Sequence, residues 1–316
     1  MNITGDVAKR IALIDAPGDL GAGNRGASDG PGALRRVGMD EDLRRAGLRI
    51  TRPKQVLGPA NGDSKIVSGS RNLHAVATWC SAVRDSVARE LTYGHLPVLI
   101  GGDHALSIGS IAAVSQFCRE RRKRLEIVWL DAHADFNTHR TTPTGNVHGM
   151  PVAVLSGDGP RELTEISAVR PMVDISQITL VGIRSIDDGE KRRIRKRGLR
   201  TYPMRQINRL GMLNVMKEVV SRVFQTNSHL HVSFDVDFMD PSAAPGVGTR
   251  EPGGPDLIQT ELCLSMLADT GVLGSVDVVE LNPRYDREDR TAKNVSSLLR
   301  TLLVRGAKRT VDSATF

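Results

Sequence analysis

Three short segments of the sequence carry acidic and imidazole side chains: GGDH at 101–104, DAHAD at 131–135 and DVD at 235–237. Side chains alternate along an extended chain, so every second residue of DAHAD and of DVD lies on one face. The residues selected by this alternation, together with the nearby histidine, are His104, Asp131, His133, Asp135, Asp235 and Asp237. We expect these four carboxylates and two imidazoles to converge at one edge of the fold.

Such a cluster of groups predicts a pair of metal ions. Two carboxylates 4 Å apart repel by about 4 kcal/mol at an effective dielectric constant near 20, so four of them need cations between them. The ligand set is too large for one ion and suits two ions roughly 3.5–4 Å apart, bridged by oxygen. An oxygen-rich set without thiolates disfavours structural zinc and favours Mn²⁺, with Fe²⁺, Co²⁺ or Ni²⁺ as substitutes.

The elements that position these groups are short apolar runs that alternate with longer amphipathic segments. The predicted strands are 10–15, 97–100, 126–130, 178–183, 229–234 and 272–281. The predicted helices are 33–46, 70–92, 106–121, 188–198, 205–225, 256–269 and 287–304. Strands that are apolar throughout are buried on both faces, as parallel strands are. The alternation predicts an α/β fold with a mainly parallel, doubly wound sheet of about eight strands and helices on both faces.

The three polar segments follow three of these strands directly. GGDH comes after 97–100, DAHAD after 126–130 and DVD after 229–234, while Glu280 lies near the end of 272–281. Ligands of open parallel sheets bind at the carboxyl ends of the strands. No repeat, linker or shift in composition marks a boundary, so residues 1–316 are predicted to form a single domain.

Composition restricts the location and the partners of the chain. Hydrophobic residues make up 40% and aromatic residues 3% of the 316 residues, which suits a soluble protein and disfavours a surface that stacks nucleic-acid bases. No run reaches the ~18 apolar residues of a membrane span, and the N-terminal residues lack the apolar segment of a secretory signal. Cys80, Cys118 and Cys263 lie far apart, which predicts reduced thiols and a cytoplasmic location.

The net charge of +7 raises the question of a nucleic-acid partner. Basic residues concentrate at 119–124 and 191–200, each after a helix-like segment and with almost no aromatic residues. We interpret both runs as solvated helix ends and predict neither a nucleic-acid nor a membrane partner. The alternative is a non-catalytic metal-binding or nucleic-acid-binding module, which would show salt-dependent retention on DNA.

A second alternative is a dinucleotide-binding enzyme, because Gly21, Gly23 and Gly26 match GxGxxG after a strand. That motif requires the following helix to begin inside the glycine segment, where its N-terminus meets the pyrophosphate. Here residues 29–32, DGPG, intervene before any predicted helix, which disfavours this interpretation.

Four segments resemble the signature blocks of the ureohydrolases, the superfamily of arginases and agmatinases. They are GASDGPGALR (26–35), GGDHALSIG (101–109), DAHADFNT (131–138) and SFDVDFMDPSAAPGVGT (233–249). The resemblance implies an arginase-like fold, a homo-oligomer (trimer or hexamer), a small guanidino substrate and two Mn²⁺ ions per subunit. It assigns the metal ligands to the same six residues that the alternation selects.

Other matching positions imply contacts with the substrate and identify arginase as the most similar branch. TTPTGNVHGMP (141–151) resembles the arginase loop that receives an α-carboxylate, and GIRSIDDGE (182–190) resembles the block that holds an α-amino group. The implied substrate residues are Asn137, Thr144 and Asn146 for the carboxylate, Asp187 and Glu190 for the amino group, and Thr249 and Glu280. His148 matches the position of a proton shuttle.

These residues predict hydrolysis of L-arginine to L-ornithine and urea. A guanidinium is a poor electrophile, so its carbon requires hydroxide, which a metal pair can supply by lowering the pKa of bound water. We expect a bridging hydroxide to attack and form a neutral tetrahedral intermediate. Asp135 then passes a proton to the leaving amine, while Glu280 holds the guanidinium through a charge-assisted pair.

Three positions depart from the arginase pattern. Ser185 stands where arginases usually have Asp, Arg250 replaces the usual proline, and Arg140 adds a cation after DAHAD. Two cations near the mouth of the site would repel an arginine side chain, unless they point into solvent where salt screens them over ~8 Å. The alternative functions are those of the sister enzymes: agmatinase, guanidinobutyrase or formimidoylglutamase.

Overall fold

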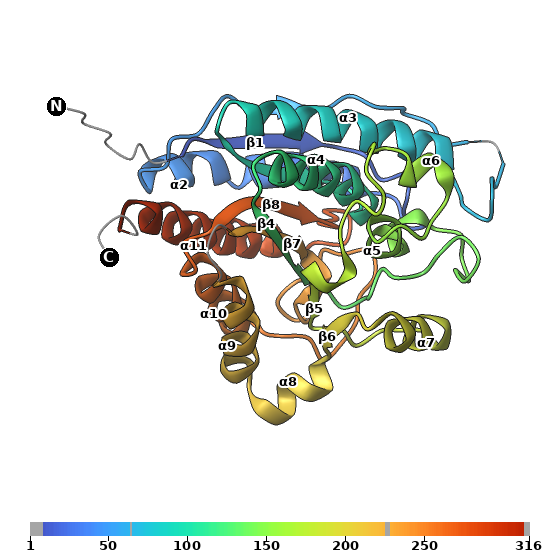
Figure 1. Cartoon of the computed structure of the whole chain (residues 1–316). Coiled ribbons are helices and arrows are strands. Elements are labelled where there is room, and N and C mark those ends of the chain that lie inside the picture. The colour runs from blue at the N-terminus through green and yellow to red at the C-terminus, as the bar shows by residue number, and fades with distance from the viewer. Residues whose placement is uncertain (1–8, 64, 225–227, 313–316) are drawn as a thin grey trace.

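The computed structural model describes residues 9–63, 65–224 and 228–312, which fold around one sheet (Figure 1). Its eight strands are all parallel and lie in the order β2-β1-β3-β8-β7-β4-β5-β6. They are β1 (Ile11–Ala16), β2 (Lys54–Gln55), β3 (Leu96–Gly101), β4 (Arg124–Leu130), β5 (Ile178–Val181), β6 (Arg200–Tyr202), β7 (Ser228–Asp235) and β8 (Leu273–Val279). The prediction of a parallel sheet of about eight strands in a single domain is confirmed.

All six predicted strands are present, and the two that the sequence did not indicate are the edge strands β2 and β6. β2 has the sequence KQ and β6 the sequence RTY. An edge strand is short and partly exposed, so it needs no apolar run to cover two buried faces. These two strands therefore carry no signal in the hydrophobic pattern.

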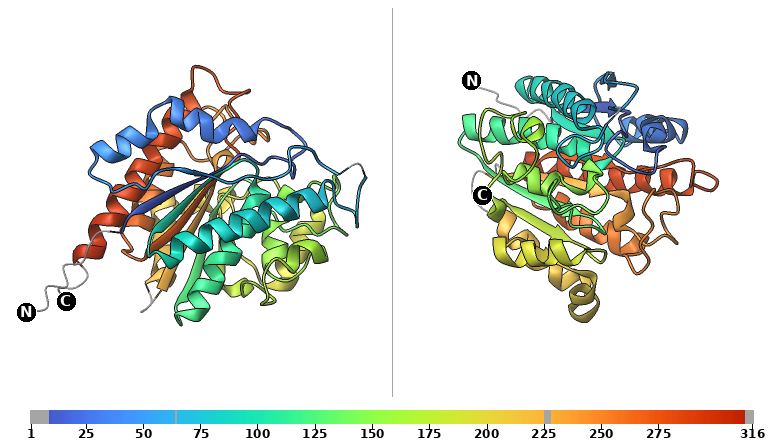
Figure 2. Two further views of the ribbon diagram at one scale, coloured as in Figure 1. Left: turned by 90° about the horizontal axis from the view of Figure 1, so that it is seen from above. Right: turned by 90° about the vertical axis from the view of Figure 1, so that its right-hand side faces the viewer.

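Helices cover both faces of the sheet, as the two views of Figure 2 show. They are α1 (Gly30–Arg36), α2 (Met39–Arg45), α3 (Leu73–Thr92), α4 (Ser107–Glu120), α5 (Pro151–Leu155), α6 (Arg161–Thr164), α7 (Asp188–Arg197), α8 (Met204–Leu210), α9 (Met212–Val223), α10 (Leu257–Ala268) and α11 (Arg290–Asp312). Short 3₁₀ turns are η1 (Ala27–Asp29), η2 (His104–Leu106), η3 (Val147–Gly149), η4 (Ile175–Gln177) and η5 (Val236–Phe238).

The predicted helices 33–46 and 205–225 were wrong in one respect, because each is two helices. Gly38 separates α1 from α2 with φ 80°, and Gly211 separates α8 from α9 with φ 82°. Both values lie in the left-handed region that glycine adopts without strain and that ends a helix. The short helices α5 and α6 were not predicted.

Two apolar cores lie on opposite faces of the sheet. Along β4, Val128 and Leu130 belong to the core beneath α9, α10 and α11, whereas Ile127 and Trp129 belong to the core beneath α3 and α4. Successive side chains of a strand point to opposite faces, so an apolar strand contributes to both cores. This arrangement confirms the prediction that the strands are buried on both sides.

The two central strands are also joined by a buried polar cluster. His231 of β7 lies with Nε2 3.3 Å from Asp277 Oδ2 of β8, and Asp277 Oδ1 accepts a hydrogen bond of 2.6 Å from Ser110 of α4. The His231 Nδ1 atom lies 2.9 Å from the hydroxyl of Ser275. These contacts fix the strands that end at Asp235 and near Glu280.

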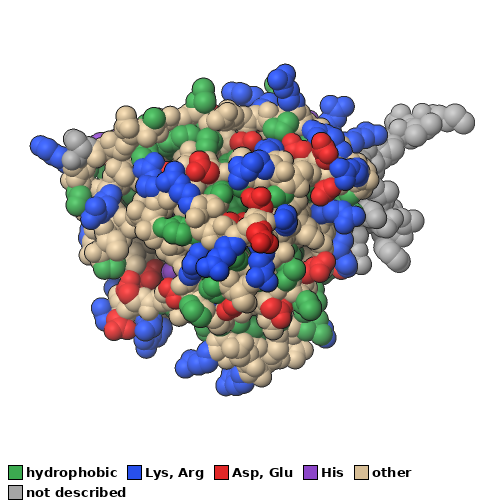
Figure 3. All heavy atoms as spheres, turned by 180° about the vertical axis from the view of Figure 1, so that it is seen from behind, with side chains coloured by type: hydrophobic (Ala, Val, Ile, Leu, Met, Phe, Trp, Pro, Cys, Tyr) green, Lys and Arg blue, Asp and Glu red, His purple; other side chains and the backbone are tan. Residues whose placement is uncertain are grey.

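The basic runs make contacts within the chain itself. Arg119 donates to the carbonyl of Met172, Arg121 lies 4.0 Å from the ring centroid of Phe117, and Arg193 pairs with Asp158 at 2.8 Å. On the face drawn in Figure 3, Lys and Arg side chains are interspersed with Asp and Glu. Among the described residues, no helix has the length and apolar character that crossing a membrane requires.

Candidate metal centre and active site

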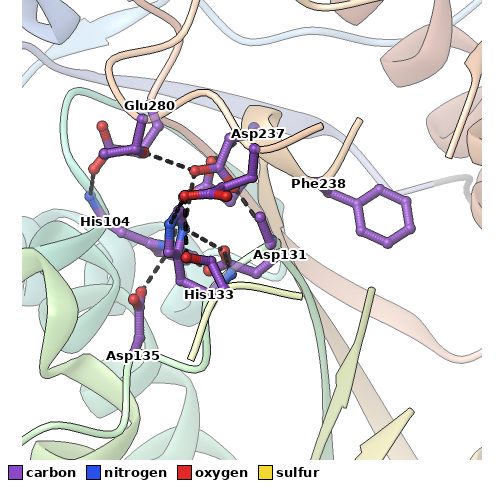
Figure 4. Close-up of polar contacts among 12 residues, drawn as sticks. His104, Asp131, His133, Asp135, Asp237, Phe238 and Glu280 are labelled. Atoms are coloured by element: carbon purple, nitrogen blue, oxygen red, sulfur yellow. Dashed lines mark hydrogen bonds and ion pairs between the residues drawn. The ribbon is translucent and has the colours of Figure 1, made fainter. Parts of the chain in front are cut away.

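The acidic and imidazole groups predicted to converge do so beyond the carboxyl ends of β3, β4 and β7 (Figure 4). His104 Nδ1 lies 3.1 Å from Asp131 Oδ2, 3.1 Å from Asp135 Oδ2 and 3.0 Å from Asp235 Oδ2. His133 Nδ1 lies 3.1 Å from Asp237 Oδ2 and 3.5 Å from Asp131 Oδ1. Six residues from three separate segments therefore form one cluster.

Local backbone geometry aims each of these side chains. Asp235, the last residue of β7, accepts from the N–H of Asp237 at 2.9 Å and so turns the chain into η5. Asp103 caps η2 by accepting from the N–H of Ala105, which places His104 at the start of this turn. Asp135 adopts φ 48°, in the left-handed region, and Glu280 adopts φ 65°. Non-glycine residues held in this region are often found at functional sites.

The cluster fits two divalent cations. Its carboxylates and imidazoles make up two groups of mutually close ligand atoms, His104–Asp131–Asp135 and Asp131–His133–Asp237, with Asp131 in both. Although three carboxylate oxygens lie within 3.1 Å of the buried Nδ1 atom of His104, it makes no hydrogen bond of good geometry with any described residue. A buried polar atom without a partner is costly unless a ligand satisfies it. Asp131 would contribute to both ligand groups.

The pKa values of the carboxylates reflect this crowding. Burial and the charge of Asp131 raise the pKa of Asp135 to about 6. Burial and the charge of Asp237 raise the pKa of Asp235 well above its ordinary value. Both groups therefore resist ionisation next to their neighbours, and cations bound between the carboxylates would remove this penalty.

Two supporting residues were missed by the sequence analysis. Trp129 donates from Nε1 to Asp131 Oδ2 at 2.8 Å and stacks on the ring of His104, with 4.0 Å between the ring centroids. The Ser233 hydroxyl lies 2.9 Å from His104 Nε2. Trp129 lies two residues before Asp131, and Ser233 lies two residues before Asp235. The alternation of side chains along a strand therefore places each on the same face as the ligand that follows it, and this signal could have identified both.

A pocket of about 320 Å³ opens onto the cluster. Every residue assigned to the site from the sequence lines it, except Asp131, which is fully buried. Among the described residues that line it are six carboxylates and no Lys or Arg: Asp135, Asp187, Glu190, Asp235, Asp237 and Glu280. A concave site of this charge suits a cationic ligand.

The two additional cations noted in the sequence do not line this pocket. Arg250 donates to the carbonyls of Pro245 at 2.8 Å and Tyr285 at 3.0 Å, and its guanidinium lies over the Tyr285 ring. Arg140 is exposed and donates to the neighbouring ring of His139. The expected repulsion of a cationic side chain at the mouth therefore has no structural basis at either position.

Polar groups proposed to bind the rest of a substrate lie on the same pocket. Asn137 Nδ2 donates to Asp187 Oδ2 at 2.7 Å, and Asp187 with Glu190 forms a capping box at the start of α7. Burial raises the pKa of Glu190 to about 7. Thr144 and Asn146 lie on the loop between β4 and η3. Asp187 and Glu190 line the pocket as well as capping α7, so the capping role leaves both side chains next to the cavity.

His148 and Glu280 form a pair at the pocket wall. His148 Nδ1 lies 2.9 Å from Glu280 Oε1, which also accepts from the backbone N–H of His104 at 3.0 Å. Burial disfavours a charged imidazole, but attraction to Glu280 outweighs it and raises the pKa of His148 to about 9. Thr249 donates to Asp237 Oδ2 at 2.8 Å, so it reaches the cluster itself.

The glycine segment after β1 binds the chain's own carboxylates. The N–H groups of Gly21 and Ala22 donate to Asp103 Oδ2, and the N–H of Gly26 donates to Asp19. α1 begins at Gly30, beyond the glycine motif. The N–H groups of Gly21, Ala22 and Gly26 are thus already used within the chain.

Comparison with known proteins agrees with this geometry. The model of the Arginase family matches residues 9–304. The chain belongs to the arginase family. The arginase of Bacillus caldovelox is 38% identical over 300 residues, covering 93% of this chain and 98% of the relative. The arginase of Brevibacillus brevis is 35% identical over 291 residues, covering 92% and 96%.

Solved arginases share the fold as well as the sequence. The crystal structure of arginase from Bacillus cereus matches with a TM-score of 0.86 and 34% identity, covering 93% of this chain and 98% of that chain. The resemblance to ureohydrolases that the sequence motifs indicated is confirmed, and so is the arginase-like fold.

Proposed function

We propose that this protein hydrolyses L-arginine to L-ornithine and urea, using two Mn²⁺ ions per subunit. The observation that carries the proposal is the acidic pocket, which holds both the metal-capable cluster and the Asn137–Asp187 pair. No Lys or Arg is found among the described residues that line it. The arginase relatives, similar over more than nine-tenths of this chain, support the same substrate. Oxygen-rich ligands with two imidazoles support Mn²⁺ as the metal.

The proposed ion ligands are His104, Asp131, His133, Asp135, Asp235 and Asp237. When bound, the ions supply hydroxide at neutral pH by lowering the pKa of water from about 15.7 to about 7. Glu280 holds the guanidinium and so fixes the carbon to be attacked. The contacts of Glu280 with the His104 N–H and with His148 Nδ1 both use Oε1, which leaves Oε2 to receive a guanidinium N–H.

Proton transfer completes the reaction. After hydroxide adds to the guanidinium carbon, the Asp135 carboxylate takes the proton of the added hydroxyl and passes it to the side-chain nitrogen of the nascent ornithine. The bond between this nitrogen and the carbon then breaks, and urea and ornithine leave. Asn137, Thr144 and Asn146 hold the α-carboxylate, and Asp187 and Glu190 hold the α-ammonium group through charge-assisted bonds.

The proposal also covers the location, oligomeric state and partners of the enzyme. We propose a cytoplasmic homo-oligomer, trimeric or hexameric, with no nucleic-acid or membrane partner. The proposal of no nucleic-acid or membrane partner is supported by the basic runs, whose Arg119 and Arg193 make contacts within the chain.

Urea release from L-arginine tests the proposed activity. Metal-stripped protein to which Mn²⁺ has been restored is expected to form urea and ornithine in equal amounts, and the stripped protein is expected to form neither. Both products are measured from one reaction. No ornithine from L-arginine after Mn²⁺ restoration, with urea formed from another guanidino compound instead, would contradict the substrate assignment.

His148→Asn is expected to lower kcat by about 10- to 100-fold near neutral pH. A general acid contributes ~10²–10⁴-fold, and solvent can partly replace this one because the His148 side chain is 19% exposed. The pKa of His148 is raised to about 9, so the imidazole carries its proton below that pH and loses it above. The wild-type kcat should therefore fall above about pH 9. A pH profile with the same alkaline limb in His148→Asn would contradict the shuttle role.

A further inference from the structure

We propose that Glu251 is a positioning residue for the metal ligand His133 and that Ser185 orients its carboxylate. The inference rests on the proposed metal-dependent function and names a residue outside the pocket that controls one of the two ions. It follows from the contacts of the far side of the His133 ring, the side turned away from the acidic cluster.

The two nitrogens of His133 face different carboxylates. Nδ1 faces Asp237 and Asp131 inside the cluster, whereas Nε2 lies 3.8 Å from Glu251 Oε1. Metal-bound histidines commonly donate their other ring N–H to a carboxylate, which fixes the orientation of the ring and raises its basicity. At 3.8 Å the contact is electrostatic, longer than a direct hydrogen bond.

His104 shows the same construction on the other side of the cluster. Its Nδ1 points at three carboxylates, and its Nε2 lies 2.9 Å from the Ser233 hydroxyl. Each imidazole therefore has one nitrogen directed to the cluster and one held from outside. For His133, Glu251 is the outside group.

The backbone at Glu251 is held firmly in place. Arg184 donates to the Glu251 carbonyl from Nε at 3.0 Å and from a terminal nitrogen at 2.8 Å. The same guanidinium donates to the carbonyls of Asp237 and Phe238, which ties this loop to η5. On the other side, Arg250 is anchored on the carbonyls of Pro245 and Tyr285. The loop that carries Glu251 is thus fixed at the Glu251 carbonyl and at Arg250.

Ser185 completes the arrangement. Its hydroxyl donates to Glu251 Oε1 at 3.0 Å, and its backbone pairs with His133 in a parallel bridge. Ser185 carries no charge of its own, so Glu251 supplies the negative charge that faces the outer nitrogen of His133. Glu251 itself does not line the pocket, so its influence should reach the metal through His133 without changing substrate contacts.

The test compares Mn²⁺ affinity, measured by isothermal titration calorimetry on metal-stripped protein, in Glu251→Gln and Glu261→Gln. Glu261 is the matched control, because it is an exposed carboxylate that also accepts from a hydroxyl, that of Thr301 at 3.1 Å. Loss of such an outer carboxylate costs ~10–100-fold in metal affinity. Since the Glu251 side chain is 35% exposed, we expect about a tenfold loss. The loss should affect one of the two ions, with KM for arginine unchanged at saturating Mn²⁺.

Two further variants separate positioning from folding. Ser185→Asp in the Glu251→Gln background should restore the affinity, because it returns a carboxylate beside His133, and the metal-free variants should unfold at the wild-type temperature. Equal affinities in Glu251→Gln and Glu261→Gln, with two ions bound to the wild type, would overturn this inference alone. A wild-type protein that binds no Mn²⁺ would overturn both the inference and the proposed function.

Discussion

Asp135→Asn is expected to lower kcat for arginine hydrolysis by about 10³-fold, within the ~10²–10⁴-fold that a positioned proton donor contributes. The amide cannot carry the proton to the leaving nitrogen, although it keeps the shape of the side chain. Burial and the charge of Asp131 raise the pKa of Asp135 to about 6, so this carboxyl accepts a proton more readily than an ordinary aspartate.

This prediction is checked by steady-state urea release with a parallel measurement of bound metal. Asp131, His133 and Asp237 form a ligand group without Asp135, so part of the metal should remain bound in the variant. A variant that keeps near-normal kcat would remove Asp135 from the proton transfer. Asp240→Asn provides a control, since Asp240 lies near η5 and does not line the pocket.

L-Arginine is expected to be a better substrate than agmatine by about 10²–10³-fold in kcat/KM. Agmatine lacks the α-carboxylate, so the groups assigned to it, Asn137, Thr144 and Asn146, lose their partner. Hydrogen bonds to a charged group contribute about 1.5–3 kcal/mol each, and a tenfold change in rate corresponds to about 1.4 kcal/mol. Thr144 is exposed, so its hydrogen bond to the α-carboxylate should contribute less than this full free energy.

The comparison requires both substrates at the same Mn²⁺ concentration and pH. Thr144→Val should narrow the ratio, because it removes a hydroxyl while keeping the volume of the side chain. Similar kcat/KM values for arginine and agmatine would contradict the carboxylate-binding role of this loop. The sister activities would then become the better account of the pocket.

Much of the fold was predictable because burial leaves a signal in the sequence. The six longer strands are apolar on both faces, so each run marked a strand of the sheet. β2 and β6 lie at the edges, where two or three residues suffice and no such pattern is required. The breaks at Gly38 and Gly211 depend on left-handed backbone conformations that interrupt an otherwise helical pattern.

The cluster was predictable for a different reason. Strand alternation and the shared edge of parallel strands are general rules, and they selected the six residues that converge. The contact between Ser185 and Glu251 could not be predicted, because 66 residues separate them and only the folded loop brings them together. For the same reason the sequence left open whether Arg250 faces the pocket, which it does not line.

The number of manganese ions bound per chain tests the central claim most directly. Protein stripped of metal, reloaded with Mn²⁺ and freed of unbound ions should contain two Mn per chain by elemental analysis. Asp131 belongs to both ligand groups, so Asp131→Ala should lose most of this manganese. Reloaded wild-type protein that retains no manganese, or only one ion per chain, would contradict the account.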